Sequence, residues 1–324
     1  MRKKLRYFMK QRIIPIFLIL CLLAGCGQAA APEEERMTIL ATTYPVYLFA
    51  SAVADGVEGV TVERLDTGSV SCLHDYTLSV TDMKKIEGAD VIAMNGAGLE
   101  DFMDDALAAS DAAVIDCSQG VELLFTLEHG QEDDHAGHDH DHGDYDPHIW
   151  MSPMCADHMV SAIRERLSEL DPDNAQAYEE NAGAVSNKLG VLDTEISALF
   201  DGLRAQGKEV MGLITFHEGF QYFARDYDLP LLAAIEEEAG SEASAKEILE
   251  ITQLVQEHKI PVIFTEVNGS DATANAVARE TGCRVAQLSM CMDGPDGALS
   301  NYFEALMDNT IAIVNGFAGE EVVS

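Results

Sequence analysis

The sequence predicts an α/β protein in which two lobes of parallel sheet are joined by one long helix. Three observations predict this class. Short apolar segments alternate with helical segments over the first half of the 324 residues, and the same alternation recurs over the second half. Between the halves, residues 172–206 contain no strand signal and no proline after Pro172. Such alternation is typical of parallel sheets with helices on both faces, because parallel strands need a long crossover connection.

Residues 37–170 are expected to form the first lobe. Asp90–Met94 is an apolar run stopped by Asn-Gly, as is typical of a buried strand. Helices are expected to begin after Ser79, in the manner of a capping box, and after Ser152, where a proline takes the first helical position. In order, the segments are strand 37–41, helix 47–54, strand 60–65, helix 79–87, strand 90–94, helix 99–109, strand 112–115 and the helix after Ser152.

Residues 171–206 are expected to form one amphipathic helix that links the lobes. At 1.5 Å per residue this helix would be about 50 Å long. The same spacing would suit a coiled coil, but Gly183, Gly190 and the single stretch favour a connector that bisects the mature chain. Apolar residues recur at the three-, four- and seven-residue steps of one helix face, namely Tyr178, Val185, Leu189, Leu192, Ile196, Leu199 and Leu203.

Residues 207–318 repeat the alternation and are expected to form the second lobe. Ser244 followed by Glu247 again predicts a capped helix. Because ligands bind beyond the carboxyl ends of parallel strands, the cleft between the lobes is the expected binding site. In order, the segments are strand 210–215, helix 218–227, strand 231–235, helix 244–258, strand 261–265, helix 271–281, strand 284–288 and helix 299–314.

The first 36 residues predict export and attachment to a membrane. Residues 1–25 combine a basic front, an apolar run and small residues, which is typical of a secretory signal peptide and not of a membrane-spanning helix. The ending Leu-Ala-Gly-Cys resembles a bacterial lipobox, which implies cleavage before Cys26 and a lipid on its sulfur; an ordinary signal with a chance cysteine is the alternative. Residues 26–36 are expected to be a polar tether. The folded part is therefore expected outside the cytoplasmic membrane, anchored by lipid.

The charge of the chain argues against nucleic acid as a partner. The formal charge is −36, and removal of the six basic residues in 1–25 would leave 14 Lys and Arg against 56 Asp and Glu, or −42. Nucleic-acid binding needs a basic surface. A negative field attracts cations, although the same charge would also serve solubility alone.

The cysteines give little guidance. Of seven, one is expected to leave with the signal and Cys26 to take lipid. An exported protein can form disulfides but need not do so. Cys283 and Cys291 could pair, whereas Cys72, two residues before His74, is either a stray ligand or a loop thiol.

Residues 128–146 are expected to form a loop rich in histidine and acid. Six of the ten histidines lie between Leu127 and His148. Neutral imidazoles among carboxylates are the composition that collects a borderline divalent cation. A solvated charged loop is the alternative, but such a loop has no need of imidazoles. We expect low-affinity metal binding by His129, His135, His138, His140 and His142.

Three further histidines follow strand-like segments, at junctions from which both lobes could direct side chains into one cleft. They are His74, His148 and His217. A fourth junction carries Asp293, which could complete a tetrahedral shell of three nitrogens and one oxygen, as suits zinc at about 2.0–2.2 Å. Glu266 or water could take the place of Asp293. Each histidine alone could be structural, but three at equivalent edges predict a metal site.

Several motifs occur together in this chain: the lipobox, His74–Tyr76, Asn95–Glu100, the acidic His-rich loop, Asp146–Trp150, His217–Phe223 and Phe264–Glu266. In combination they resemble the metal-binding lipoproteins of zinc and manganese ABC importers (ZnuA/TroA-like). The resemblance spans the mature chain. It implies two Rossmann-like lobes with parallel sheets, one long backbone helix between them, and one divalent ion in the interlobe cleft. It carries the ligand roles onto His74, His148, His217 and Asp293.

The resemblance implies an extracytoplasmic receptor that captures a metal ion and delivers it to a membrane permease driven by an ATPase. Imidazole suits zinc, whereas carboxylate-rich sites suit manganese, and manganese members of the family tend to carry a carboxylate at the position of His217. Zn²⁺ is therefore expected, with Mn²⁺ as the alternative. Four protein ligands leave no open position for a reactive water, so we expect no enzyme.

Two alternatives belong to other classes of protein. A zinc-dependent hydrolase would need an open site and a general base such as Glu218, but no HExxH motif begins at His217. A surface adhesin could be the same lipoprotein without contradiction. We expect a monomer with no nucleic-acid partner.

Overall fold

The computed structural model describes residues 36–65, 73, 76–126, 145–235, 243–267 and 269–323. The expected signal peptide, Cys26, Cys72, His74 and the five low-affinity histidines lie outside the described residues. Over the described part of the chain, no helix is both long enough and apolar enough to cross a membrane.

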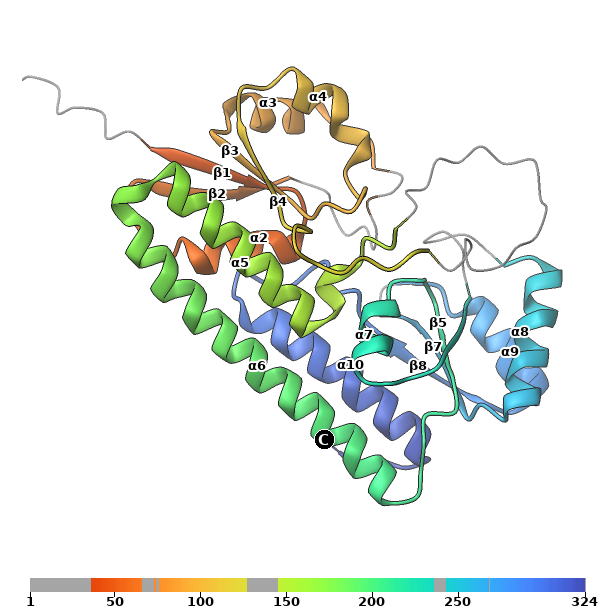
Figure 1. Ribbon diagram of the computed structural model, residues 1–324. Helices are drawn as coiled ribbons and strands as arrows, with labels where there is room; N and C mark the ends of the chain where they lie inside the picture. The colour runs from red at the N-terminus through yellow and green to blue at the C-terminus, as the bar shows by residue number, and fades with distance from the viewer. Residues whose placement is uncertain are drawn as a thin grey trace, which may run out of the picture. The chain divides into compact units, whose positions relative to one another are not determined.

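The first half contains a four-stranded parallel sheet with the order β2-β1-β3-β4 (Figure 1). Each strand lies within one residue of its expected bounds. Because the strands are parallel, the carboxyl ends of β1, β2, β3 and β4 all lie at the same edge of the sheet. The strands are β1 Met37–Ala41, β2 Val60–Arg64, β3 Val91–Met94 and β4 Ala113–Asp116.

Helices cover both faces of this sheet, as its parallel pairing requires. Ile39 and Ala41 of the central strand pack into the core formed with α2 and α5, while Leu40 between them packs on the other face with α3 and α4. Figure 1 shows α3 and α4 on one side of the sheet and α2 and α5 on the other. The helices are α2 Tyr44–Val53, α3 Val80–Gly88, α4 Asp104–Ala108 after a 3-10 turn at Asp101–Met103, and α5 Pro153–Leu170.

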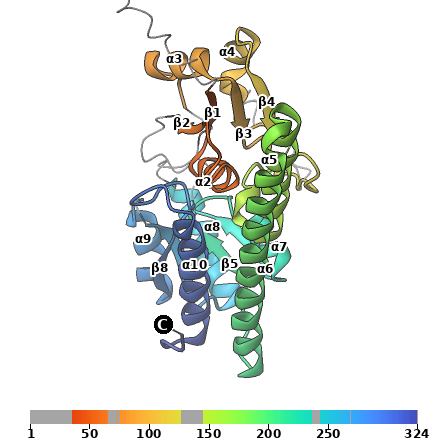
Figure 2. The ribbon, with the colours of Figure 1, turned by 90° about the vertical axis from the view of Figure 1, so that its left-hand side faces the viewer.

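The long central helix is α6, Ala175–Ala205, which follows a 3-10 turn at Pro172–Asn174. Its apolar face is buried as the spacing predicts, except that Leu199 is half-buried and Phe200 takes the core position. α6 packs against α5 from the first half and against α10, Ser300–Ala318, from the second half (Figures 1 and 2). One helix therefore supports both halves of the described chain.

The second half contains two parallel strand pairs, β5 with β6 and β7 with β8. Every expected strand and helix of this half is present, and Ser244 and Glu247 form the predicted capping box. Residues 37–324 form one compact unit, so the division at residues 170 and 206 stays a prediction. The elements are β5 Leu213–Thr215, α7 Gln221–Asp226, β6 Leu231–Ala234, α8 Ala245–His258, β7 Val262–Glu266, α9 Ala272–Thr281 and β8 Arg284–Leu288.

Candidate metal centre

His148 lies in the segment that leads from the first sheet into α5, and it is only 2% exposed. Its backbone φ of −79° and ψ of 43°, with a bond from Ile149 N to Pro147 O, make it the centre of an inverse γ-turn. Asp146 Oδ1 accepts hydrogen bonds from the His148 backbone N–H at 2.9 Å and pairs with ring Nδ1 at 2.7 Å. With a carboxylate oxygen as the acceptor, ring Nδ1 is the donor in this contact, which leaves Nε2 as the atom that can bind a metal.

His217 follows β5 in the second half and is 4% exposed. The Thr215 hydroxyl donates to the His217 carbonyl at 2.8 Å, which fixes the start of the loop. The Nε2 atoms of His217 and His148 lie 3.2 Å apart, with the ring planes 82° from parallel. Two nitrogens bound to one zinc ion at about 2.0–2.1 Å and a tetrahedral angle would be about 3.3 Å apart. The two rings are therefore spaced to share one ion.

Gly219 permits this approach of the two loops. A Cβ at this position would lie 2.1 Å from Met290 Cε and 3.1 Å from His148 Cδ2. Any larger residue would have to displace the side chains that pack the site. The glycine after His217-Glu218 thus has a steric role in the site.

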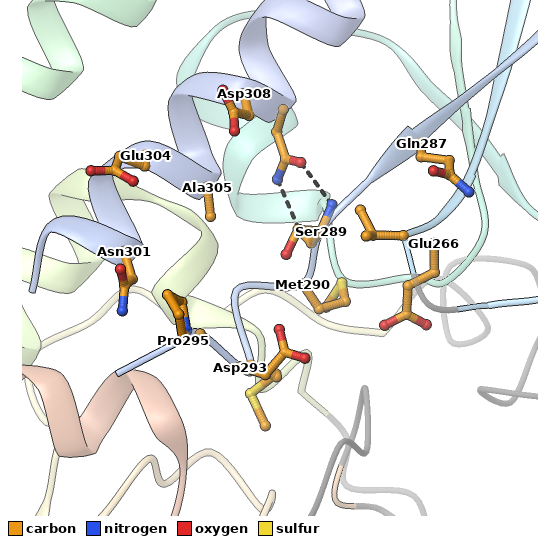
Figure 3. Close-up of a pocket in the computed structure, with 14 residues that line it drawn as sticks. Glu266, Gln287, Ser289, Met290, Asp293, Pro295, Asn301, Glu304, Ala305 and Asp308 are labelled. Carbon is orange, nitrogen blue, oxygen red and sulfur yellow. Dashed lines mark hydrogen bonds between the residues drawn. The ribbon is translucent and has the colours of Figure 1, made fainter. Parts of the chain in front are cut away.

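Asp293 and Glu266 are two of the four carboxylates that line a cavity of about 350 Å³, with Glu304 and Asp308 of α10; His148 and His217 do not line it, but Met290 does. Asp293 is exposed in the loop after β8, and half-buried Glu266 ends β7. In the view of Figure 3, Met290 lies between the side chains of Asp293 and Glu266. Met290 also packs against Gly219, close to the His148 ring. Among the described residues, no group of three or more His, Cys, Asp or Glu side chains comes together as a metal site. The structure thus joins His148 with His217 and places Asp293 and Glu266 in a cavity that Met290 also lines, while His74 lies outside the described residues.

Hydrogen bonds link the two halves around the site. The Trp150 indole donates to the Met290 carbonyl at 2.8 Å, so the turn after His148 supports the loop that bears Asp293. The Tyr302 hydroxyl of α10 donates to the Trp150 carbonyl at 2.7 Å. The Tyr44 hydroxyl of α2 donates to the Asp296 carbonyl at 2.5 Å. Two side chains of the first half, Trp150 and Tyr44, therefore hold the Asp293 loop of the second half.

Three buried polar residues near His148 were not predicted as functional. Asp146 orients the ring, as described above. Asn95, directly after β3, donates from Nδ2 to the Pro147 carbonyl at 2.8 Å, and Tyr222 of α7 donates to the Asp146 carbonyl at 2.6 Å. The Asp-Pro-His spacing could have suggested Asp146, since a carboxylate two residues from a ligand can reach the ring. No sequence signal marks the partners of Asn95 and Tyr222.

Glu100 is a buried carboxylate at the same edge of the sheet and is 1% exposed. It accepts hydrogen bonds from the Thr42 hydroxyl at 2.6 Å and from the backbone N–H groups of Asn95 at 2.7 Å and Gly96 at 3.0 Å. Burial raises the pKa of Glu100 from 4.5 to about 7, against the opposing effect of these three bonds, and the negative charge of Asp116 adds to the rise. Glu100 thus fixes the loops that follow β1 and β3.

The possible disulfide between Cys283 and Cys291 is absent, because both are free thiols. Cys291 is buried beside the Asp293 loop, and burial raises the pKa of its thiol to about 12. It therefore remains protonated at neutral pH in the metal-free protein.

Comparison with known proteins identifies the family. A family model described as the periplasmic zinc-uptake complex component A, ZnuA, matches residues 39–316. The zinc-binding lipoprotein AdcA of Streptococcus pneumoniae serotype 4 is 32% identical over 280 residues, which is 85% of this chain and 52% of the relative. The chain thus spans about half the length of this curated relative.

Solved structures of other proteins have a fold similar to that of this chain. A crystal structure of ZnuA matches with a TM-score of 0.72 and 27% identity, over 87% of this chain and 99% of that chain. The solute-binding protein FpvC of Pseudomonas aeruginosa, in complex with Ni²⁺, matches with a TM-score of 0.72 and 25% identity, over 88% and 97% of the two chains. The family model matches residues 39–316, and the parallel sheets and long helix agree with the solved structures. The chain therefore belongs to the ZnuA family of metal-binding solute-binding proteins.

Proposed function

We propose that this protein is the extracytoplasmic receptor of an ABC importer, which captures Zn²⁺ and delivers it to a membrane permease. The observation that carries the proposal is the 3.2 Å separation of the His148 and His217 Nε2 atoms, with the ring of His148 oriented by Asp146. A buried pair of imidazoles in this arrangement binds a cation well only if further ligands complete the shell. The proposed ligands are His74, His148, His217 and Asp293, with Glu266 or water as the alternative to Asp293.

The choice of zinc is supported by the donor set and by the names of relatives. Imidazole nitrogens suit zinc better than manganese, and AdcA is named a zinc-binding lipoprotein. The Ni²⁺ complex of FpvC indicates that this fold accepts other divalent ions. Mn²⁺ therefore stays the alternative cargo, to be separated from zinc by titration.

Capture and delivery, rather than catalysis, is the proposed activity. The family is one of metal-binding receptors and not of enzymes. Four protein ligands would leave no position for a reactive water. A hydrolase would show zinc-dependent turnover of peptide or ester substrates, and we expect none.

The proposed location is the outer face of the cytoplasmic membrane, with a lipid on Cys26. This rests on the signal-like residues 1–25 and on the lipoprotein name of AdcA. The low-affinity histidines of residues 128–146 are proposed to collect ions close to the site, since His148 follows them directly in the chain. Growth of a deletion strain in chelated medium would test import, and a strain that grew normally there would favour the adhesin alternative.

The central experiment is a titration of the metal-free protein with Zn²⁺ and Mn²⁺. We expect one tight zinc site per chain, retained when the His-rich residues are deleted, and additional weak sites that are lost with them. His217→Ala should weaken tight binding by at least about 100-fold, because it removes a direct ligand rather than a supporting group. His158→Ala is the matched control, since His158 is exposed on α5. Unchanged tight binding in His217→Ala would contradict the proposed site.

A further inference from the structure

We propose that Asn95 and Tyr222 form a carbonyl clamp that positions His148 against His217. The two side chains come from opposite halves of the chain and donate to two consecutive backbone carbonyls, those of Pro147 and Asp146. These are the two carbonyls that directly precede His148. The consequence for zinc affinity rests on the proposed function, whereas the positioning of the ring can be tested without metal.

The backbone of this segment explains why its carbonyls matter. Pro147 has no N–H, and the His148 N–H is used within the segment by Asp146 Oδ1. Asp146 therefore orients the ring of His148 relative to its own segment but does not connect the segment to the Asn95 loop or to α7. The Asn95 loop and α7 instead form hydrogen bonds with this segment through the carbonyls of Pro147 and Asp146.

The first donor is supported by the first sheet. Asn95 is fully buried directly after β3, and its backbone N–H is bound by Glu100. Its Nδ2 reaches Pro147 O at 2.8 Å and Gly96 O at 3.0 Å. The Oδ1 atom is buried and makes no hydrogen bond with the described residues. Among the described residues, the Asn95 side chain therefore forms hydrogen bonds only through its Nδ2 donor.

The second donor belongs to α7, the helix that follows the His217 loop. Tyr222 is fully buried in α7, five residues after His217. Its hydroxyl donates to Asp146 O at 2.6 Å and accepts from Leu124 N at 3.1 Å. The guanidinium of Arg225 lies 5.2 Å from the centre of its ring, which adds a cation–π contact. A short, rigid path thus runs from the His217 loop through Tyr222 to the peptide next to His148.

Two nearly isosteric variants test the two arms of the clamp. Tyr222→Phe removes only the hydroxyl. Asn95→Leu removes the donor at similar volume and leaves no former partner of Oδ1 unsatisfied. The matched control is Tyr227→Phe at the end of α7, where a 4% exposed tyrosine donates to Asp193 Oδ1 instead of to the site. Circular dichroism and thermal unfolding would establish that each variant folds, and either clamp variant alone suffices for the test.

The first measurement uses metal-free protein, with ¹H–¹⁵N spectra of the histidine rings. We expect the ring signals of His148 to shift or broaden in Tyr222→Phe and in Asn95→Leu, and to stay as in the wild type in Tyr227→Phe. A structural role alone would lower thermal stability in all three variants without this selective change. Unchanged His148 signals in the folded clamp variants would overturn the proposal.

The second measurement is zinc affinity by competition with a chelator. Loss of a group that orients a ligand costs about 10- to 100-fold in metal affinity, and we expect this from each clamp variant. Tyr227→Phe should stay within about twofold of the wild type, as for a distant independent site. Equal losses in control and clamp variants would overturn the proposal. If the wild type itself bound no zinc tightly, the proposed function would fail, and the ring spectra would still decide whether the clamp exists.

Discussion

Glu100 should make the stability of the metal-free protein depend on pH in a defined direction. Its pKa is about 7 in the folded chain, against 4.5 without burial. The folded state therefore binds the proton more tightly, and the stabilisation from protonation is fully present below about pH 4.5 and lost as the pH rises to about 7. At about 1.4 kcal/mol per pH unit, the free energy of unfolding should fall by about 2–3 kcal/mol between pH 5 and pH 8 because of this one group.

Urea unfolding of the wild type and of Glu100→Gln at pH 5 and pH 8 would measure this contribution. The glutamine variant should lack it, while the other carboxylates titrate alike in both proteins, so the difference between their pH dependences isolates Glu100. Glu257→Gln, at an exposed position on α8, should behave as the wild type. If the wild type and Glu100→Gln lost stability equally from pH 5 to pH 8, the inferred charge of the buried carboxylate would be wrong.

Three more predictions follow from the same structure. Gly219→Ala should lower zinc affinity at least about tenfold, because its Cβ would press on Met290 and His148; a chelator competition with unchanged affinity would refute the steric role. Gly96→Ala should cost about 2–3 kcal/mol in urea unfolding, because φ is +82° and the new Cβ would lie 2.0 Å from Asp116 Oδ1; a cost below that of an ordinary surface change would refute it. Free zinc at 1,000 times its Kd should raise the free energy of unfolding by about 4 kcal/mol, and manganese at the same concentration should raise it less; the reverse order would favour manganese as the cargo.

The fold could be predicted from local patterns because its parallel strands are short apolar runs and its helices carry recognisable caps. Most errors lie at element ends, but the expected helix at 99–109 is instead a 3-10 turn at Asp101–Met103 followed by the short α4, and the expected strand at 210–215 keeps only its last three residues. The first helix begins at Tyr44 and not at residue 47, since the Thr43 side chain caps it by accepting from Val46 N at 3.3 Å and a proline occupies its first turn. The long helix begins at Ala175 because Pro172–Asn174 forms a 3-10 turn. Both differences come from caps and turns, which decide bounds that apolar spacing leaves open.

The site could be predicted only as far as its individual residue types allow. His148 and His217 stand out as histidines after strand ends, and the structure confirms that they meet although 69 residues separate them. The roles of Asn95 and Tyr222 depend on partners 52 and 76 residues away, which no local pattern encodes. Glu100 belongs to a recognisable motif, but its raised pKa follows from complete burial, which a sequence does not display.

The hydrogen bond from the Trp150 indole to the Met290 carbonyl has a consequence for how long a bound metal ion would stay in the protein. It joins the turn after His148 to Met290, at the buried start of the Asp293 loop. Separating these segments would break this hydrogen bond and expose the fully buried indole ring to water, which costs the burial of its apolar surface. For the proposed receptor we therefore expect slow spontaneous dissociation, so that the residence time of the ion is set by encounters with the proposed permease rather than by thermal opening.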